Sequence, residues 1–325
     1  MFSAKPLSLR LVCYHHPLLT SKPNPTTTRK LINGGFPSRL LCNGASLTTA
    51  SPLSLKGTNV VITGGSSGIG RAIAIEFARQ GSYCTLIGRN EDRLKSALHE
   101  ICDHSMSNVP HRYVVGDVRD RSFWDALSSG NIKSTRFIES PVETFLADDI
   151  PERLYPNVLI NNAGVTHSSL LLREHPSIIE SVIETNLMGT IWGCKYMAKL
   201  MLPKPTTRRV PNSRCIINIS SLLATHGGKG CSVYSASKAG VLGFTRALSA
   251  ELGPLGVRIN AIVPGYTNTA MLDGLSITTE TIEKSIPASR VGTPEDIAHA
   301  AMFLAQNGYA NNCIVNLDGG LSAVM

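Results

Sequence analysis

Apolar and polar positions follow two alternating patterns from residue 56 to the end of the chain. Short apolar runs rich in β-branched residues, each ended by glycine or a polar residue, predict buried strands. Between them lie longer stretches whose apolar residues recur about every 3.6 positions, which predicts helices. The predicted strands span residues 58–65, 84–90, 111–118, 157–164, 214–221, 257–265 and 313–320, and the predicted helices residues 66–81, 91–104, 177–202, 232–256 and 294–307.

This succession of strand and helix predicts an α/β protein with a doubly wound parallel sheet, a Rossmann-type fold, in a single domain. Parallel strands need crossover connections, so helices should cover both faces of the sheet. Ligands of such folds bind at the carboxyl ends of the strands. Residues 120–157 and 203–213 interrupt the pattern, and we expect both to be surface insertions.

Positive charge is concentrated near the N-terminus. The chain carries 31 basic and 23 acidic residues, a formal net charge of +8. Six of the basic residues and no acidic residue lie within residues 1–55, so the rest of the chain is nearly neutral and gives no support for a nucleic-acid partner. The same segment is rich in Ser and Thr, which is typical of an organelle-import presequence.

We therefore expect residues 1–55 to be a targeting presequence and linker, and residues 56–325 to be the catalytic domain. The mitochondrial matrix is the favoured destination, a plastid is the alternative, and a basic tail with no targeting role also fits. The eight cysteines are single and no histidine cluster has metal-ligand spacing, so we expect reduced thiols and no metal. No apolar run reaches about 18 residues, so no membrane span is expected.

A glycine-rich stretch, "TGGSSGIG" (residues 63–70), joins the first predicted strand to the first predicted helix. Glycines allow a tight turn and a close approach of the backbone, and a helix start offers free N–H groups to a phosphate. Such a motif is weak by itself, but its place in the first βαβ unit favours a dinucleotide site. The second strand is followed by Arg89 where an NAD site usually has an acid, which favours NADP(H), although an exposed arginine at a strand end explains it equally simply.

Tyr234 and Lys238 lie one helical turn apart in "SVYSASKAG". A spacing of this kind arises by chance about once in every two chains of this composition. Here, however, a strand ending in Ser220 and Ser221 precedes the pair. The combination favours a catalytic group over a solvated helix face.

Seven motifs occur in an order and spacing similar to those of the short-chain dehydrogenase/reductases: "TGGSSGIG", "GDV", "NNAG", "ETN", "ISS", "YSASK" and "PGYTNTAM". The resemblance covers roughly residues 56–325. Within this family the chain looks most like the 3-oxoacyl-(acyl carrier protein) reductases, on "GVTHSSLLLRE", "SASKAGVLGFTRALSAELGPLGVRINAIVPG" and "IPASRVGTPEDIAHAAMFLA".

The resemblance implies a set of functional residues by position. The catalytic set is Asn186, Ser221, Tyr234 and Lys238, where the family's interval of 13 residues before the tyrosine selects Ser221 over Ser220. The implied cofactor contacts are Gly64, Ser66, Ser67, Gly68, Ile69, Gly70, Arg89, Asp117, Val118, Asn162 and Thr267, together with Tyr234 and Lys238. Asp117 is expected near the adenine.

The chemistry of ketone reduction needs such groups. An alkoxide formed by hydride transfer must be protonated, and a tyrosine with an ordinary pKa of about 10 is a poor acid near neutral pH. We expect the Lys238 cation to lower the pKa of Tyr234 and to hold the nicotinamide ribose, and Ser221 to hydrogen-bond the carbonyl oxygen. The family implies a water held by Asn186 that connects Lys238 to solvent.

The expected function is NADPH-dependent reduction of a 3-oxoacyl thioester on acyl carrier protein. A broad carbonyl or quinone reductase is the first alternative, and a non-catalytic cofactor-binding subunit the second. A homotetramer is expected from the family alone. A basic loop with Lys204, Arg208 and Arg209, followed by Arg214, could receive an acidic carrier protein, although such loops are more often only solvated.

Further expectations concern individual residues and one short segment. His167, His226 and Cys231 are interpreted as loop or packing residues rather than acid/base groups. Ser67 stands where many relatives have a basic residue that helps to bind the NADP phosphate, so the NADP prediction depends mainly on Arg89. Asn311 and Asn312 stand where many relatives have Thr-Gly, so packing there is expected to differ, and the polar segment after "PGYTNTAM" predicts a small substrate lid.

Overall fold

The computed structural model describes residues 52–105, 109–130, 155–202, 214–272 and 278–325. The chain divides into two units, Met1–Ala50 and Ser51–Met325, and the fold described below is that of the second. The predicted presequence, the basic loop at 203–213 and most of the predicted 120–157 insertion lie outside the described residues.

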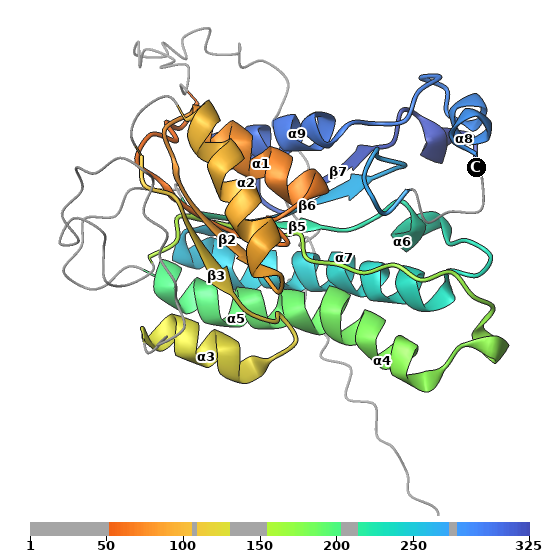
Figure 1. The fold of residues 1–325 in the computed structure, drawn as a ribbon, viewed down its shortest axis with the longest axis horizontal. Coiled ribbons are helices and arrows are strands. Elements are labelled where there is room, and N and C mark those ends of the chain that lie inside the picture. Colours follow the sequence, from red (N-terminus) through yellow and green to blue (C-terminus); the bar gives the residue numbers. More distant parts are fainter. Residues whose placement is uncertain (1–51, 106–108, 131–154, 203–213, 273–277) are drawn as a thin grey trace, which may run out of the picture. The chain divides into compact units, whose positions relative to one another are not determined.

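Seven parallel strands form one sheet in the order β3-β2-β1-β4-β5-β6-β7 (Figure 1). Their bounds are β1 Asn59–Thr63, β2 Tyr83–Gly88, β3 Arg112–Val115, β4 Val158–Asn161, β5 Arg214–Ile219, β6 Val257–Pro264 and β7 Ile314–Leu317. The strand order reverses between β1 and β4, which puts a ligand-binding crevice at the carboxyl ends of these two strands. The predicted doubly wound sheet is confirmed.

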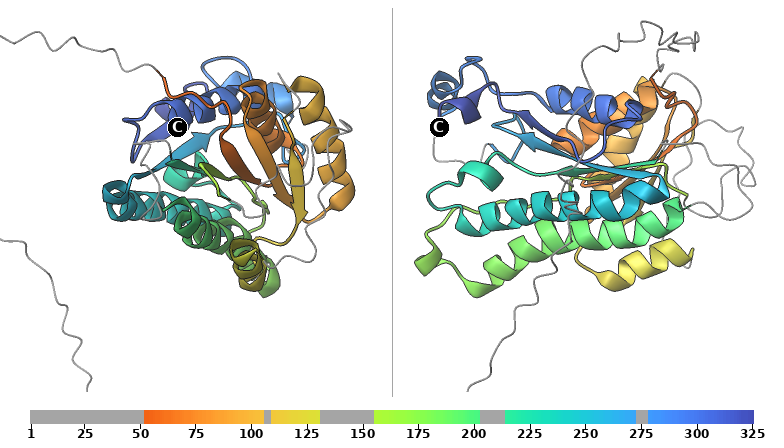
Figure 2. Two further views of the ribbon diagram at one scale, coloured as in Figure 1. Left: turned by 90° about the vertical axis from the view of Figure 1, so that its left-hand side faces the viewer. Right: turned by 180° about the vertical axis from the view of Figure 1, so that it is seen from behind.

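Helices cover both faces of this sheet (Figures 1 and 2). One layer contains α1 Gly68–Arg79, α2 Glu91–His104 and α9 Pro294–Gln306. The other contains α3 Arg121–Ser129, α4 Pro176–Ile183, α5 Gly189–Met201 and α7 Ser232–Leu252. Short helices α6 Leu223–His226 and α8 Thr279–Ser285 follow β5 and β6.

Burial on both faces explains the continuous apolar runs of the strands. Successive side chains of a strand point to opposite faces. In β1, Val60 and Ile62 join the core beneath α1, α2 and α9, whereas Val61 joins the core beneath α3 and α5. All eight residues of β6 are buried. The two cores therefore hold the sheet rigidly, so that its carboxyl edge can position a site.

Residues 177–202, predicted as one long helix, contain a change of helical type. The π-helical segment Glu184–Met188 joins α4 directly to α5 without a turn. Such segments insert an extra residue into a helix and are common at functional sites. Asn186 lies in the middle of this one and is fully buried.

The prediction of a surface insertion over 120–157 was wrong for its first part. Residues 121–129 form the amphipathic helix α3, which is part of the crossover between β3 and β4. Trp124 is fully buried in the core, and its indole Nε1 donates a hydrogen bond to the carbonyl oxygen of Val118 at 2.9 Å. The apolar positions of this short helix are too few to show a clear period in the sequence.

The asparagine pair before β7 has a structural role. Asn312 has φ of +61°, a left-handed conformation that asparagine tolerates better than most residues. The Asn311 side-chain oxygen accepts a hydrogen bond from the backbone N–H of Ile259 in β6 at 2.9 Å. The pair thus sets the entry of β7 into the sheet.

Candidate active site

The loop between β1 and α1 has the geometry of a phosphate-binding turn. Gly64 and Gly68 have φ of +65° and +52°, which favours glycine. A Cβ on Gly70 would collide with the Gly64 carbonyl oxygen and the Asn162 side chain, so α1 can begin this close to β1 only without one. Ser66 and Ile69 are half-buried in the same turn.

No side chain caps the start of α1. Ser67 is the exposed N-cap residue, and its hydroxyl makes no capping hydrogen bond. The N–H groups of the first turn, together with the helix dipole, therefore suit a phosphate. The first turn contains no acidic residue that would oppose an anion.

Asn162 holds the turn in place from the neighbouring strand. Its Nδ2 donates to the Gly64 carbonyl oxygen at 3.1 Å, and its backbone N–H donates to the Thr63 hydroxyl at 3.0 Å. The end of β4 is thereby fastened to the end of β1, across the point where the strand order reverses. Asn162 was predicted to contact the cofactor. In the structure its side chain contacts the glycine turn, which is the expected phosphate-binding segment.

The ends of β2 and β3 lie farther along the same edge. Arg89 is exposed immediately after β2. Asp117 follows β3 and is half-buried, and the Val118 side chain is buried. The guanidinium of Arg119 hydrogen-bonds the Asp117 carboxylate, and this bond holds the pKa of Asp117 below its ordinary value. Arg119 was not predicted, although its spacing of two residues from Asp117 is visible in the sequence.

Tyr234 and Ser221 meet beyond the carboxyl ends of the central strands. Tyr234 is in the first turn of α7 and is buried. The Ser221 side chain, two residues after β5, lies near enough to the phenol to act on its pKa. The neighbouring Ser220 faces elsewhere, since its hydroxyl donates to the backbone carbonyl of Lys238 at 2.9 Å. Of the two serines, the structure brings Ser221 to the tyrosine.

Lys238 lies one turn further along α7. Its Nζ donates to the carbonyl oxygen of Ile219 at 2.9 Å and lies 5.9 Å from the centre of the Tyr234 ring. Burial lowers the pKa of Lys238 to about 8, so the ammonium is mainly charged at neutral pH.

The expected lowering of the Tyr234 pKa by Lys238 is not found in the free protein. Burial raises the pKa of Tyr234 above its ordinary value of 10, and the Ser221 side chain offsets this only in part. Burial outweighs the lysine because the ammonium points to the Ile219 carbonyl rather than to the phenol. Tyr234 is therefore a neutral phenol before the reaction, which is the form that can donate a proton.

Asn186 is connected to the same helix. Its Oδ1 accepts from the Val165 N–H at 2.8 Å, while its Nδ2 donates to the Val165 carbonyl at 3.0 Å and to the Ser237 hydroxyl at 3.0 Å. A Cβ on Gly164 would lie 3.3 Å from both the Asn186 oxygen and the Lys238 Nζ. The bare glycine therefore leaves the two polar groups facing one small space.

Thr267 is buried just after β6, and its hydroxyl donates to the Gly265 carbonyl at 3.3 Å. Thr269, in the same loop, lies against Gly68, so this loop meets the glycine turn from the opposite side of the crevice. The predicted lid after it falls partly at residues 273–277, outside the described residues, and continues as α8.

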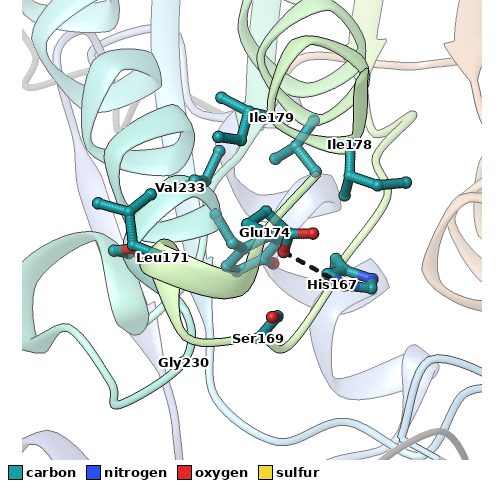
Figure 3. Close-up of a pocket in the computed structure, with 11 residues that line it drawn as sticks. His167, Ser169, Leu171, Glu174, Ile178, Ile179, Gly230 and Val233 are labelled. Atoms are coloured by element: carbon teal, nitrogen blue, oxygen red, sulfur yellow. Dashed lines mark ion pairs between the residues drawn. The ribbon is translucent and has the colours of Figure 1, made fainter. Parts of the chain in front are cut away.

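A small hollow opens beside Tyr234 (Figure 3). Apolar side chains from α4, α7 and the loop before α4 line much of it, among them Leu171, Ile178, Ile179 and Val233. An ion pair of 3.2 Å between His167 and Glu174 borders it. His226 is exposed and bonds Thr225, and Cys231 is half-buried at the N-cap of α7, in agreement with their interpretation as loop or packing residues.

These residues fit a dinucleotide. The glycine turn is open to a phosphate, a cation and a carboxylate follow the next two strands, and the tyrosine lies beyond the strand-order reversal. In the described part of the chain no group of three potential ligands is arranged to hold a metal. None of the described helices is both long and apolar enough to cross a membrane. The fold and site define a nucleotide-binding α/β protein with the groups needed for proton transfer.

Comparisons with known proteins define the family. Residues 58–143 match the family described as "short chain dehydrogenase", and residues 146–322 match the one described as "Enoyl-(Acyl carrier protein) reductase". A 3-oxoacyl-(acyl-carrier-protein) reductase of Chlamydia muridarum is 37% identical over 267 residues, covering 81% of this chain and 96% of the relative. Carbonyl reductase family member 4 of Danio rerio is 32% identical, covering 82% and 98%.

A solved structure is also similar to this chain. A putative NAD(P)-dependent gluconate 5-dehydrogenase from Beutenbergia cavernae, crystallised with bound NADP, is 32% identical with a TM-score of 0.69, and the match covers 84% of this chain and 99% of that one. The chain belongs to the short-chain dehydrogenase/reductase family, which confirms the resemblance seen in its motifs.

Proposed function

We propose that the protein is an NADPH-dependent reductase of 3-oxoacyl thioesters carried on acyl carrier protein, acting in fatty-acid synthesis. One observation supports the chemistry above all others: a buried, neutral Tyr234 has Ser221 beside its phenol and a buried lysine one turn away. The substrate class is supported by the name of the Chlamydia muridarum relative.

The chain's own residues would handle the oxygen of the substrate. A bound nicotinamide would supply the hydride to the carbonyl carbon. Ser221 would donate a hydrogen bond to the carbonyl oxygen, stabilising the negative charge that develops there. Tyr234 would donate its proton to the same oxygen, because the Ser221 side chain lies beside its phenol.

Lys238 and Asn186 would support that proton transfer. As the phenol loses its proton, the nearby ammonium stabilises the phenolate, an effect that grows in a buried site. The space between Asn186 Oδ1 and Lys238 Nζ beside Gly164 would hold a water that returns a proton. The residues proposed to hold the cofactor are the glycine turn, Ser66, Ser67, Ile69, Arg89, Asp117, Val118, Asn162 and Thr267, with Lys238 on the nicotinamide ribose.

The test of the proposed function is an assay of residues 56–325 with acetoacetyl-carrier protein, a free acetoacetyl thioester and NADPH. Oxidation of NADPH with the thioesters, absent in Tyr234→Phe, is the expected result. No turnover of any thioester length would contradict the proposed substrate.

A broad carbonyl or quinone reductase is the second candidate, favoured by the likeness to the Danio rerio carbonyl reductase. A much higher kcat/KM for free ketones or quinones than for carrier-linked substrates would support it.

A cofactor-binding subunit without catalysis is the third candidate. Unchanged turnover in Tyr234→Phe would revive that alternative, whereas the presence of Asn186, Ser221, Tyr234 and Lys238 in one site argues against it.

We also propose the division into a presequence at residues 1–55 and an enzyme at residues 56–325, import into mitochondria with a plastid as the alternative, and a homotetramer. The composition of the leader supports the first two proposals. Membership of the family supports the third, for which the size of the purified enzyme in solution is the test.

A further inference from the structure

Arg119 is a positively charged residue near the carboxyl end of β3, and it belongs to none of the family motifs. It lies two residues after Asp117, and its guanidinium forms an ion pair and hydrogen bonds with the Asp117 carboxylate. The distances are 2.7 Å from Nη2 to Oδ2, 3.0 Å from Nε to Oδ2 and 3.1 Å from Nε to Oδ1. The backbone N–H of Arg119 also donates to Oδ1 at 3.0 Å.

The topology determines which part of a dinucleotide meets this carboxylate. The glycine turn ends β1, Arg89 follows β2 and Asp117 follows β3, and these strands are neighbours in that order. The N–H of Gly116 bonds the Gly88 carbonyl at 2.9 Å, so the ends of β2 and β3 are held together. Phosphates bind at the turn after β1 and the adenosine ribose at the end of β2, so the base reaches the end of β3.

The acceptor capacity of Asp117 suits an adenine amine. A carboxylate offers about four acceptor positions. Arg119 makes four contacts with them through three N–H groups, because its Nε–H is shared between Oδ1 and Oδ2. The Asp117 side chain remains 29% exposed, so a further donor can reach the oxygen that takes the longer half of the shared contact. Because the partner is a two-pronged guanidinium, the carboxylate can no longer rotate freely, which lowers the entropy lost when the base binds.

We infer that Arg119 is a positioning residue for the cofactor: it fixes the Asp117 carboxylate so that this group accepts a hydrogen bond from the exocyclic amine of adenine. Glu184, from the π-helical segment, favours the charged form of Arg119 from the other side. Arg119 is thus assigned to the base, and Arg89 to the 2′-phosphate. The inference rests on the proposed use of a nicotinamide dinucleotide.

The experiment measures binding rather than turnover. Dissociation constants of NADPH and of NADH are determined by the fluorescence of the reduced nicotinamide for wild type, Arg119→Gln and Arg89→Gln. Arg119→Gln should weaken both dinucleotides by about tenfold, because both contain adenine. Arg89→Gln should weaken NADPH alone. Arg79→Gln is the matched control, since Arg79 pairs with Glu76 at the far end of α1 and should change neither.

Coupling to Asp117 separates a positioning role from a merely structural one. Adding Arg119→Gln to Asp117→Asn should cause no further loss of NADPH or NADH affinity, because the arginine acts through the carboxylate. Thermal unfolding of each variant shows whether it is folded. Normal binding by folded Arg119→Gln, a loss confined to NADPH, or additive losses with Asp117→Asn would each overturn the inference. Wild type that binds neither dinucleotide would instead contradict the proposed function.

Discussion

Two adjacent serines at the end of β5 have different surroundings. The Ser220 hydroxyl donates to the carbonyl of Lys238 in α7, so it fastens the sheet to the helix. The Ser221 side chain lies beside the Tyr234 phenol and partly offsets the rise of its pKa. The sequence interval preferred Ser221, and the contacts agree with that preference.

Alanine substitutions at the two serines should therefore affect different quantities. Ser221→Ala should lower kcat about a hundredfold with NADPH affinity unchanged, because one donor to the developing oxyanion is lost. Ser220→Ala should leave a folded enzyme whose free energy of unfolding is about 1 kcal/mol lower, because one buried hydrogen bond between the sheet and α7 is lost. Steady-state kinetics and urea unfolding of both variants check this. The reverse assignment of kinetic and stability losses would contradict the proposed roles.

The lowered pKa of Lys238 predicts a pH dependence. Burial brings this pKa to about 8, so the cation is present below pH 8 and is lost as the pH rises through that value. The kcat/KM for reduction, which reports the free enzyme, should therefore fall above about pH 8. Lys238→Arg keeps a charge at all these pH values, so its profile should lose this step even if its activity is lower. A step retained in Lys238→Arg would assign the titration to another group.

At the scale of the helices and strands, the contact between β2 and the start of β3 contains a buried histidine, His111. It lies just before β3 and is 2% exposed, and its Nδ1 accepts a hydrogen bond from the N–H of Cys84 in β2 at 3.2 Å. Its Nε2 is buried and has no hydrogen-bond partner among the residues that the structure describes. Burial lowers the pKa of His111 from 6.5 to about 4, so the neutral ring belongs to the folded state.

His111 should make the stability of the protein depend on pH in a defined window. The unfolded chain takes up a proton at about pH 6.5 and the folded chain only near pH 4, so stability is complete above pH 6.5 and falls between these values. The loss should reach roughly 3 kcal/mol at most. Urea unfolding from pH 7.5 to 4 measures it.

The matched variants are His111→Gln and His104→Gln. Glutamine at 111 keeps an acceptor for Cys84 but cannot titrate, so the slope between pH 6.5 and 4 should become smaller. His104 is exposed at the end of α2, and its replacement should leave the slope unchanged. Equal slopes in wild type and His111→Gln would show that other groups carry the pH dependence.

At the scale of the whole molecule, residues 1–55 differ in composition from the rest of the chain. Residues 1–55 contain six basic residues and no acidic residue, so they account for +6 of the formal net charge of +8. The presequence proposal predicts that residues 1–55 direct a fluorescent protein into mitochondria, whereas a fusion of residues 56–325 stays outside. Microscopy with mitochondrial and plastid markers checks both fusions. If both fusions stay in the cytosol, the segment is a tail without a targeting role.

By itself, the sequence determined the layered fold and the position of the glycine turn, and it supplied the candidate catalytic motif. Buried parallel strands and amphipathic helices give strong local patterns of apolar residues. The spacing of the motifs can also be read from the sequence without knowing which residues are in contact. The helix α3 was missed because nine residues with a fully buried Trp124 resemble an exposed insertion until β3 and β4 are in place.

Only the tertiary structure decided which groups face one another. It showed that burial raises the pKa of Tyr234, that Lys238 points to the Ile219 carbonyl, and that Arg119 grips Asp117. The reason is physical: hydrogen bonding and desolvation depend on separations of a few ångströms between segments far apart in the chain, whereas strand and helix periodicity is written within each segment.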